Sequence, residues 1–202
     1  MSAYNSVFSD KEIDMKRKKE QTTTIEDKMT AEALERGVNQ TMAHGEIKAY
    51  LCKLQLPKQF AENSKQANDI YKRIQSDFCK HVSRTTGSTP RYVAVKKENA
   101  DNPEYAFCLF TKADATLDKP EEYAERGREI ANGKTEHAGW GRGKLDVVEI
   151  IMDGPKFIIG SQPIQVTELN KENAIHQLQQ HLQNKRLVNA QHQRTLFVSK
   201  CP

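Results

Sequence analysis

The sequence lacks several of the patterns by which enzymes and exported proteins are recognised. Its four cysteines are far apart and form no C-x-x-C pair, so a disulfide framework or a cysteine zinc site is not expected and reduced thiols fit best. No apolar run approaches the length of a membrane span, and no hydrophobic signal segment follows Met1. No G-x-S-x-G or H-E-x-x-H motif is present. We therefore expect a soluble cytosolic protein without a metal or cofactor.

Acidic residues are also missing from residues 173–202. Four of the 31 basic residues lie there, so the other 27 balance the 27 acidic residues and the tail carries the whole net charge of +4. A basic tail of this kind can contact nucleic-acid phosphates or an acidic protein surface, and a solvated face is the simpler alternative. The candidate partner-binding residues in this tail are Lys185, Arg186, Arg194 and Lys200.

The first half of the chain is predicted to be mainly helical. Residues 1–23 are polar and charged and are expected to form a flexible arm. Asn63 is a suitable N-cap for the strongest of the expected helices, which has an apolar stripe at helical spacing. The turn residues TTGSTP (85–90) follow, so we expect a helical arm or cap over 24–88. The expected helices cover residues 25–37, 45–56 and 64–84.

The second half changes to the alternating pattern of β-strands. An α+β domain over 89–202 is therefore predicted, with a small antiparallel, ferredoxin-like sheet and helices on one of its faces. The expected strands are 91–98, 105–112, 145–152, 156–160 and 194–200, and the expected helices are 119–133 and 170–188.

Two local motifs in this half invite a functional interpretation. GWGRGK (139–144) lacks the spacing of a phosphate-binding loop and is better explained as a flexible connector. Trp140 and Arg142 within it are residue types that concentrate at binding hot spots, although packing of Trp140 over the sheet edge is the simpler alternative. Asp146 and Glu149 point to opposite faces of the expected strand and so do not form a carboxylate metal site.

Several segments of the second half resemble a known family. YAFCLFTKADA (105–115) matches a strand segment of the form LFLNKDA, with Lys112 and Asp114 in the corresponding places. GKLDVVEIIMDGPKF (143–157) is similar to a later strand pair, and HLQNKRLVNAQHQRTLFVSK (181–200) has nearly the length of a terminal helix, spacer and RxFG(C/T)SR strand. Over residues 89–200 the chain thus resembles the replication-initiator domain of the inovirus-type replication family, found on prophages and phage satellites.

The residues that differ from this family are those that carry its chemistry. The resemblance implies paired histidines that hold a divalent metal and a tyrosine that attacks a DNA phosphodiester. Glu104 and Ala106 stand where the histidines are expected, and His181 stands where the tyrosine is expected. One carboxylate and an alanine do not make a metal site, and a histidine cannot replace the tyrosine in the same reaction. The resemblance therefore implies a degenerate replication-initiator-like domain that is not an enzyme.

Two functions agree with a lost active site. The first is a phage or phage-satellite assembly protein, an external scaffold that self-associates, binds the coat protein lattice and redirects capsid size. It would act in the cytoplasm of a bacterial host, transiently on procapsids. The second is a DNA-binding replication accessory protein that does not nick its substrate.

Overall fold

The computed structural model describes residues 27–97, 102–140, 154–183 and 196–199, and for 137–140 the backbone alone. They form the α+β fold that the sequence predicted. In chain order the elements are a helix over 27–42, β1 (Ile47–Gln55), the short 3-10 helix η1 (Lys58–Phe60), α2 (Ser64–Thr86), β2 (Arg91–Lys97), β3 (Glu104–Lys112), α3 (Pro120–Trp140), β4 (Lys156–Ile159), β5 (Ile164–Val166), α4 (Lys171–Gln183) and β6 (Leu196–Val198).

The strands form one antiparallel sheet in the order β4-β1-β3-β2-β6. β4 and β5 both pair with β1, at the two ends of its length. Between them the backbone N–H of Gly160 donates to the carbonyl of Leu51, so residues 161–163 face the single residue Tyr50 as a bulge. The longest strands, β1 and β3, therefore lie side by side in the middle of the sheet.

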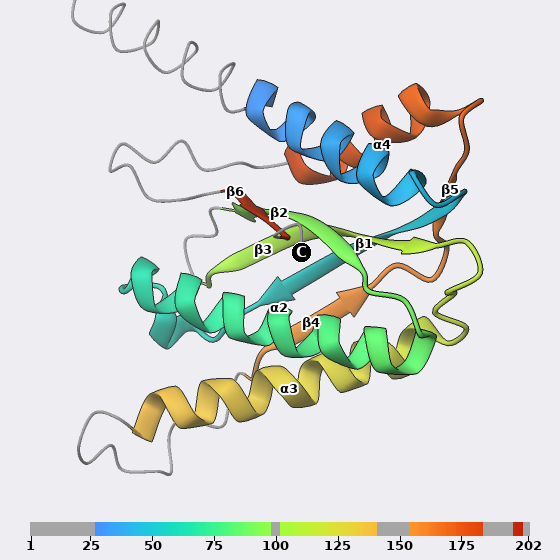
Figure 1. Cartoon of the computed structure of the whole chain (residues 1–202). Coiled ribbons are helices and arrows are strands. Elements are labelled where there is room, and N and C mark those ends of the chain that lie inside the picture. Colours follow the sequence, from blue (N-terminus) through green and yellow to red (C-terminus); the bar gives the residue numbers. More distant parts are fainter. Residues whose placement is uncertain (1–26, 98–101, 141–153, 184–195, 200–202) are drawn as a thin grey trace, which may run out of the picture.

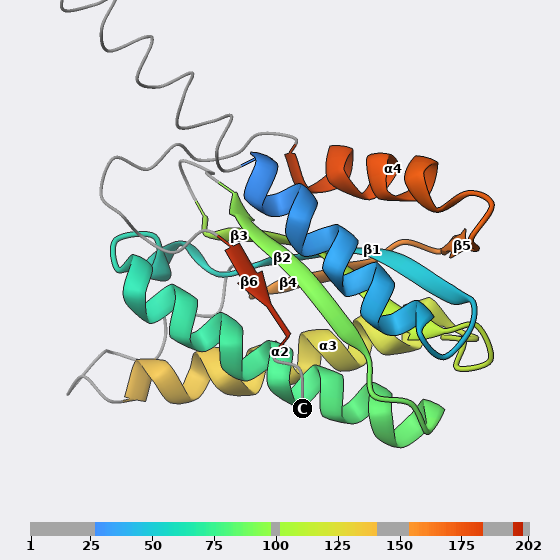
Figure 2. The ribbon, with the colours of Figure 1, turned by 45° about the horizontal axis from the view of Figure 1, so that its top comes forward.

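Helices cover both faces of this sheet, which corrects the expectation of helices on one face. Figures 1 and 2 show α2 and α3 on one side and the 27–42 helix with α4 on the other. The two hydrophobic clusters follow this division, one containing α2 side chains such as Phe78 and the other α4 side chains such as Leu178. The physical reason lies in β3, where every residue from Tyr105 to Thr111 is buried. A strand without a polar face needs cover on both sides.

Residues 47–55 form β1, whereas the sequence predicted a helix over 45–56. Ile47, Leu51 and Leu54 have the spacing of a helical stripe, which explains the error. In the structure Leu54 belongs to the cluster under α2, and Ile47 belongs to the cluster under α4. The helix expected over 45–56, within the helical arm over 24–88, is therefore wrong. Residues before and after the 85–90 connector share the same hydrophobic core.

The remaining helices agree with the sequence in type and differ in length. The side-chain Oδ1 of Asn63 accepts a hydrogen bond from the backbone N–H of Gln66 at 3.0 Å, which confirms the predicted N-cap of α2. The first helix continues past Gly37 and does not end there. That glycine lies against the sheet, where a Cβ would stand 3.2 Å from the Phe110 ring. α3 likewise passes Gly133 and ends at Trp140. No helix in the described residues is long and apolar enough to span a bilayer.

Candidate binding site at the end of the sheet

The two positions expected to carry metal-binding histidines lie on the sheet face covered by α4. Glu104 begins β3 and pairs with Gln55 of β1 and Lys97 of β2. Ala106, two residues on, points to the same face and is fully buried in the cluster that includes Leu182 of α4. A buried alanine offers no ligand, so this position serves packing alone.

Glu104 is held by an ion pair. Its Oε2 atom lies 3.0 Å from Nζ of Lys53, which comes from the neighbouring strand β1. The Glu104 side chain is 13% exposed and that of Lys53 is 41% exposed, so solvent reaches the lysine more than the carboxylate. The carboxylate is thus neutralised by a fixed ammonium group and is a poor ligand for a cation.

His181 lies in the last turn of α4 and packs down onto the same end of the sheet. Its Nε2 atom is 3.2 Å from the backbone carbonyl oxygen of Cys52. A carbonyl only accepts, so Nε2 carries the proton and the neutral imidazole donates this bond. Burial lowers the pKa of His181; the Cys52 carbonyl and Glu104 oppose this shift, whereas Lys97 and Lys53 add to it.

Lys97 completes the cluster. Its Nζ atom donates to the main-chain carbonyl of His181 at 2.9 Å, and the residue is only 8% exposed. An ammonium group at this point satisfies a carbonyl of the last helical turn and suits the negative end of the helix dipole. Lys97 therefore fixes the end of α4 to the end of β2.

The structure thus brings together Glu104, Ala106 and His181, the three positions that the resemblance placed at an active site. It surrounds them with two ammonium groups, from Lys53 and Lys97. No group of three or more potential metal ligands occurs within the described ranges. The cluster does not fit a divalent cation, because its single carboxylate is already paired and positive charges stand on two sides.

The three cysteine thiols within the described residues are equally unsuited to nucleophilic chemistry. Cys52, Cys79 and Cys108 are free thiols. Burial raises the pKa of Cys79 to about 12, partly offset by a hydrogen bond from Gln75, and burial also raises the pKa values of Cys52 and Cys108. A thiol with a raised pKa carries little thiolate at neutral pH.

Of the predicted partner-binding residues, the structure describes only the backbone of Trp140. Trp140 is the last residue of α3, on the opposite face of the sheet. Arg142, Lys185, Arg186, Arg194 and Lys200 lie outside the described residues. Lys53 and Lys97 were not identified from the sequence. The one sequence feature that could have pointed to these two lysines is their position near the ends of strands. For Lys53 that feature was not visible, because a helix was predicted there.

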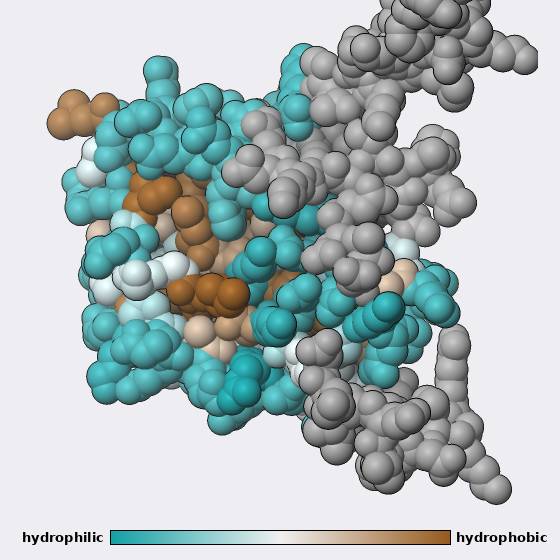
Figure 3. All heavy atoms as spheres, turned by 180° about the vertical axis from the view of Figure 1, so that it is seen from behind, coloured by the Kyte–Doolittle hydropathy of each residue, from teal (hydrophilic) through white to brown (hydrophobic). Residues whose placement is uncertain are grey.

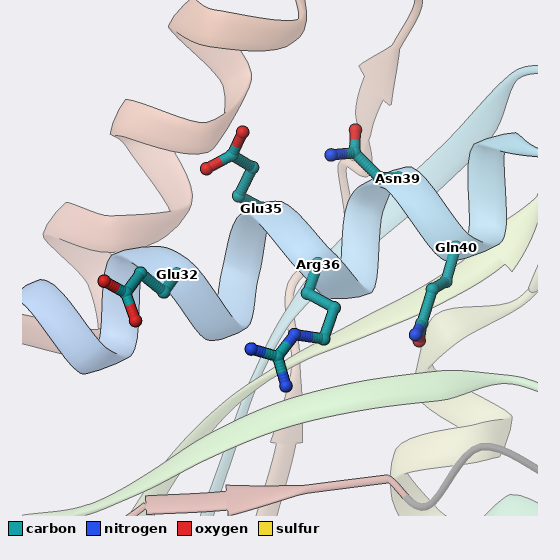
Figure 4. Close-up of a pocket in the computed structure, with 5 residues that line it drawn as sticks. All are labelled: Glu32, Glu35, Arg36, Asn39 and Gln40. Carbon is teal, nitrogen blue, oxygen red and sulfur yellow. The ribbon is translucent and has the colours of Figure 1, made fainter.

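A concave feature runs along the outer side of the 27–42 helix. This pocket of about 350 Å³ is lined by Glu32, Glu35, Arg36, Asn39 and Gln40. Figure 4 shows their side chains spread along one helix rather than pointing to a common centre. An open groove lined by the charged face of one helix lacks the converging polar groups of a ligand site.

Comparisons of the chain with family models, with curated proteins and with solved structures find no match.

The partly buried His181 predicts a pH-dependent stability. Because its pKa is lowered in the folded state, the unfolded chain takes up the proton first as the pH falls through about 6.5. Stability should therefore be full above that pH and decline as the pH falls towards the lower folded-state pKa. Urea unfolding at pH 7.5 and pH 5.5 measures this.

His181→Gln is the matched variant for that measurement. It should show a smaller loss between the two pH values, while burial of His81, whose pKa is also lowered, leaves a residual slope. An unchanged slope in His181→Gln would show that the imidazole is not buried as described.

The contacts of Glu104 and His181 also predict the result of a nicking assay. Supercoiled DNA incubated with the protein and magnesium or manganese should stay supercoiled, since Glu104 is paired with Lys53 and a histidine, His181, stands where the resemblance implies a tyrosine nucleophile. The measurement is the amount of relaxed circle on an agarose gel. Relaxed circles that vanish in His181→Ala would contradict the expectation.

Proposed function

We propose that the protein is a non-enzymatic assembly factor of a phage or phage satellite, an external scaffold that binds the coat protein lattice and redirects capsid size. The observation that supports this most is the use of Glu104 and His181 in structural contacts, with Lys53 and with the Cys52 carbonyl. A domain that resembles a replication initiator and uses these positions to hold its sheet and helix together is suited to binding rather than catalysis.

The fold suits a scaffold subunit in two respects. The sheet is covered by helices on both faces, which makes the subunit a rigid block with helical outer surfaces. The outer sides of α2 and α3 carry ion pairs at i, i+3 spacing, which keep these surfaces charged and solvated. An external scaffold requires a self-contact and a coat contact, and each can be weak because a lattice multiplies them.

The test is co-expression with candidate phage coat proteins, followed by electron microscopy of the particles. Particles formed with the protein should be uniformly smaller than those formed without it and should carry it on the outside. The protein added to finished particles serves as the control for non-specific adsorption. Particles of unchanged size with every candidate coat protein would refute the scaffold.

DNA binding without nicking is the second candidate, favoured by the ammonium groups of Lys53 and Lys97 at the positions that resemble a DNA-processing site. It predicts gel shifts whose affinity falls steeply as salt is added. A scaffold should leave naked DNA unshifted at the same protein concentrations. The two assays together separate the two functions.

A further inference from the structure

An exposed surface lies on the sheet beside the C-terminal end of α4. The register pairs Lys53 with Ile158 and Gln55 with Lys156, and directly opposed residues in an antiparallel pair share a face. This is the face of the Lys53–Glu104 ion pair and of His181. We call it the β1–β4 patch, made of Lys53, Gln55, Lys156, Ile158 and the partly buried Leu51.

The centre of the patch is apolar and open. Ile158 is 54% exposed, while its neighbours Phe157 and Ile159 point to the other face and are buried. Among the described residues, Met29, Ile158 and Leu169 are the large hydrophobic side chains that are exposed, and of these Ile158 alone lies in a strand. Figure 3, seen from behind the view of Figure 1, shows hydrophobic residues gathered within a hydrophilic surround. Such an arrangement marks a contact surface.

The rim of the patch is positively charged. Lys156 is exposed and has no ionic partner in the described part of the chain, and Lys53 remains 41% exposed beside its partner Glu104. The two ammonium groups, of Lys53 and Lys156, therefore outnumber the one carboxylate beside the patch, that of Glu104. An apolar centre between two lysines complements a segment that carries an apolar side chain flanked by carboxylates.

β4 supplies a backbone as well as side chains. It is the last strand on this side of the described sheet, and its hydrogen bonds in that sheet go to β1 alone. An extended segment can add to such an edge through main-chain hydrogen bonds, while alternate side chains choose the sequence. Ile158 and Lys156 are two residues apart, so the complementary pair on an added strand is also two residues apart.

We propose that the β1–β4 patch binds an extended segment of another protein in which an apolar residue and an acidic residue are spaced i, i+2. The segment lies beside β4, with its apolar side chain over Ile158 and its carboxylate at Lys156. This rests on the proposed function in that, on a capsid, the coat protein would supply the segment.

The probe is a short fluorescein-labelled peptide in which leucine is flanked two residues away on each side by glutamate, with threonines between. A control peptide has lysine in place of glutamate. Fluorescence anisotropy with the full-length chain should show binding of the acidic peptide, weakened about tenfold or more in the lysine peptide because attraction becomes repulsion. Equal affinities for the two peptides would overturn the charge complementarity.

Three variants locate the contact. Lys156→Glu should reverse the preference between the peptides, and Ile158→Ser should weaken binding of both. Lys65→Glu, an exposed lysine in the first turn of α2, is the matched control and should leave binding unchanged. Thermal unfolding of each variant confirms that the fold is kept. Full binding by Ile158→Ser would overturn the proposal.

Two other occupants would give different results. If the wild-type chain binds no peptide and Glu149→Lys makes binding possible, the chain's own residues 145–152 fill the patch and the proposal fails. If light scattering shows a dimer that Ile158→Ser dissociates, and no peptide binds, a second copy fills it and the proposal also fails.

The outcome is separable from that of the scaffold hypothesis. Peptide binding with capsids of ordinary size would refute the scaffold and keep the patch. Small capsids formed equally well with Lys156→Glu and Ile158→Ser would keep the scaffold and refute the patch as its coat contact.

Discussion

Replacing Leu54 by alanine should lower the free energy of unfolding by about 2–5 kcal/mol. Leu54 is fully buried in β1, between β3 and β4, and belongs to the cluster under α2 and α3. Alanine leaves a cavity that the rigid surroundings fill only in part, so lost burial and lost packing add. Urea unfolding followed by circular dichroism measures the change.

Leu169→Ala is the matched control, because the same atoms are removed from a fully exposed side chain. It should change the free energy of unfolding by no more than about 0.5 kcal/mol. Equal and small effects of the two substitutions would mean that β1 is not a central strand. The helical arm expected from the sequence would then be the better description of that segment.

Gly127→Ala should destabilise the protein by about 1–3 kcal/mol, since it inserts a methyl group into a filled space. Gly127 lies in α3 where the helix packs on β4, and a Cβ there would stand 2.6 Å from Cδ1 of Phe157. Phe157 cannot easily move aside, because its ring lies against those of Phe78 and Phe107. The midpoint of thermal or urea unfolding reports the loss.

Gly133→Ala in the same helix is the control, and it should change the stability in the opposite direction. A Cβ at this position meets nothing within 4 Å. Alanine is favoured over glycine in a helix interior by about 0.5–1 kcal/mol, so this variant should be slightly stabilised. If both substitutions stabilised the protein, α3 would not approach β4 as closely as described.

The two pairs of variants also bear on the candidate site. β1 supplies Lys53 and the Cys52 carbonyl, which hold Glu104 and His181. β4 supplies Lys156 and Ile158 of the β1–β4 patch. A variant that loosens either strand should therefore weaken peptide binding only where it leaves a measurable share of the chain unfolded, whereas Ile158→Ser should weaken binding with the fold kept.

Much of the local structure follows from the sequence. The alternation in 91–98 and 105–112 predicted β2 and β3, and Asn63 predicted the start of α2. These segments can be predicted from the sequence because the residues that define them are close together in the chain. Turn residues bound a strand, and a capping residue lies next to its helix. The α+β class follows from the same local signals.

Other features depended on contacts between distant residues. Residues 47–55 have apolar side chains at both helical and strand spacing, and pairing with β3, β4 and β5 selects the strand. The second helical layer is required because β3 is buried on both faces, whereas the alternation in 105–112 predicted a strand with one buried face.

The candidate site was likewise predicted from the sequence only in part. The resemblance identified Glu104, Ala106 and His181, and it did so by their places within short motifs. The sequence alone thus determined which positions differ from the residues of the family that it resembles. Only the tertiary structure brought Lys53 and Lys97 to those positions, because strand register and the docking of α4 join residues up to 129 positions apart in the chain.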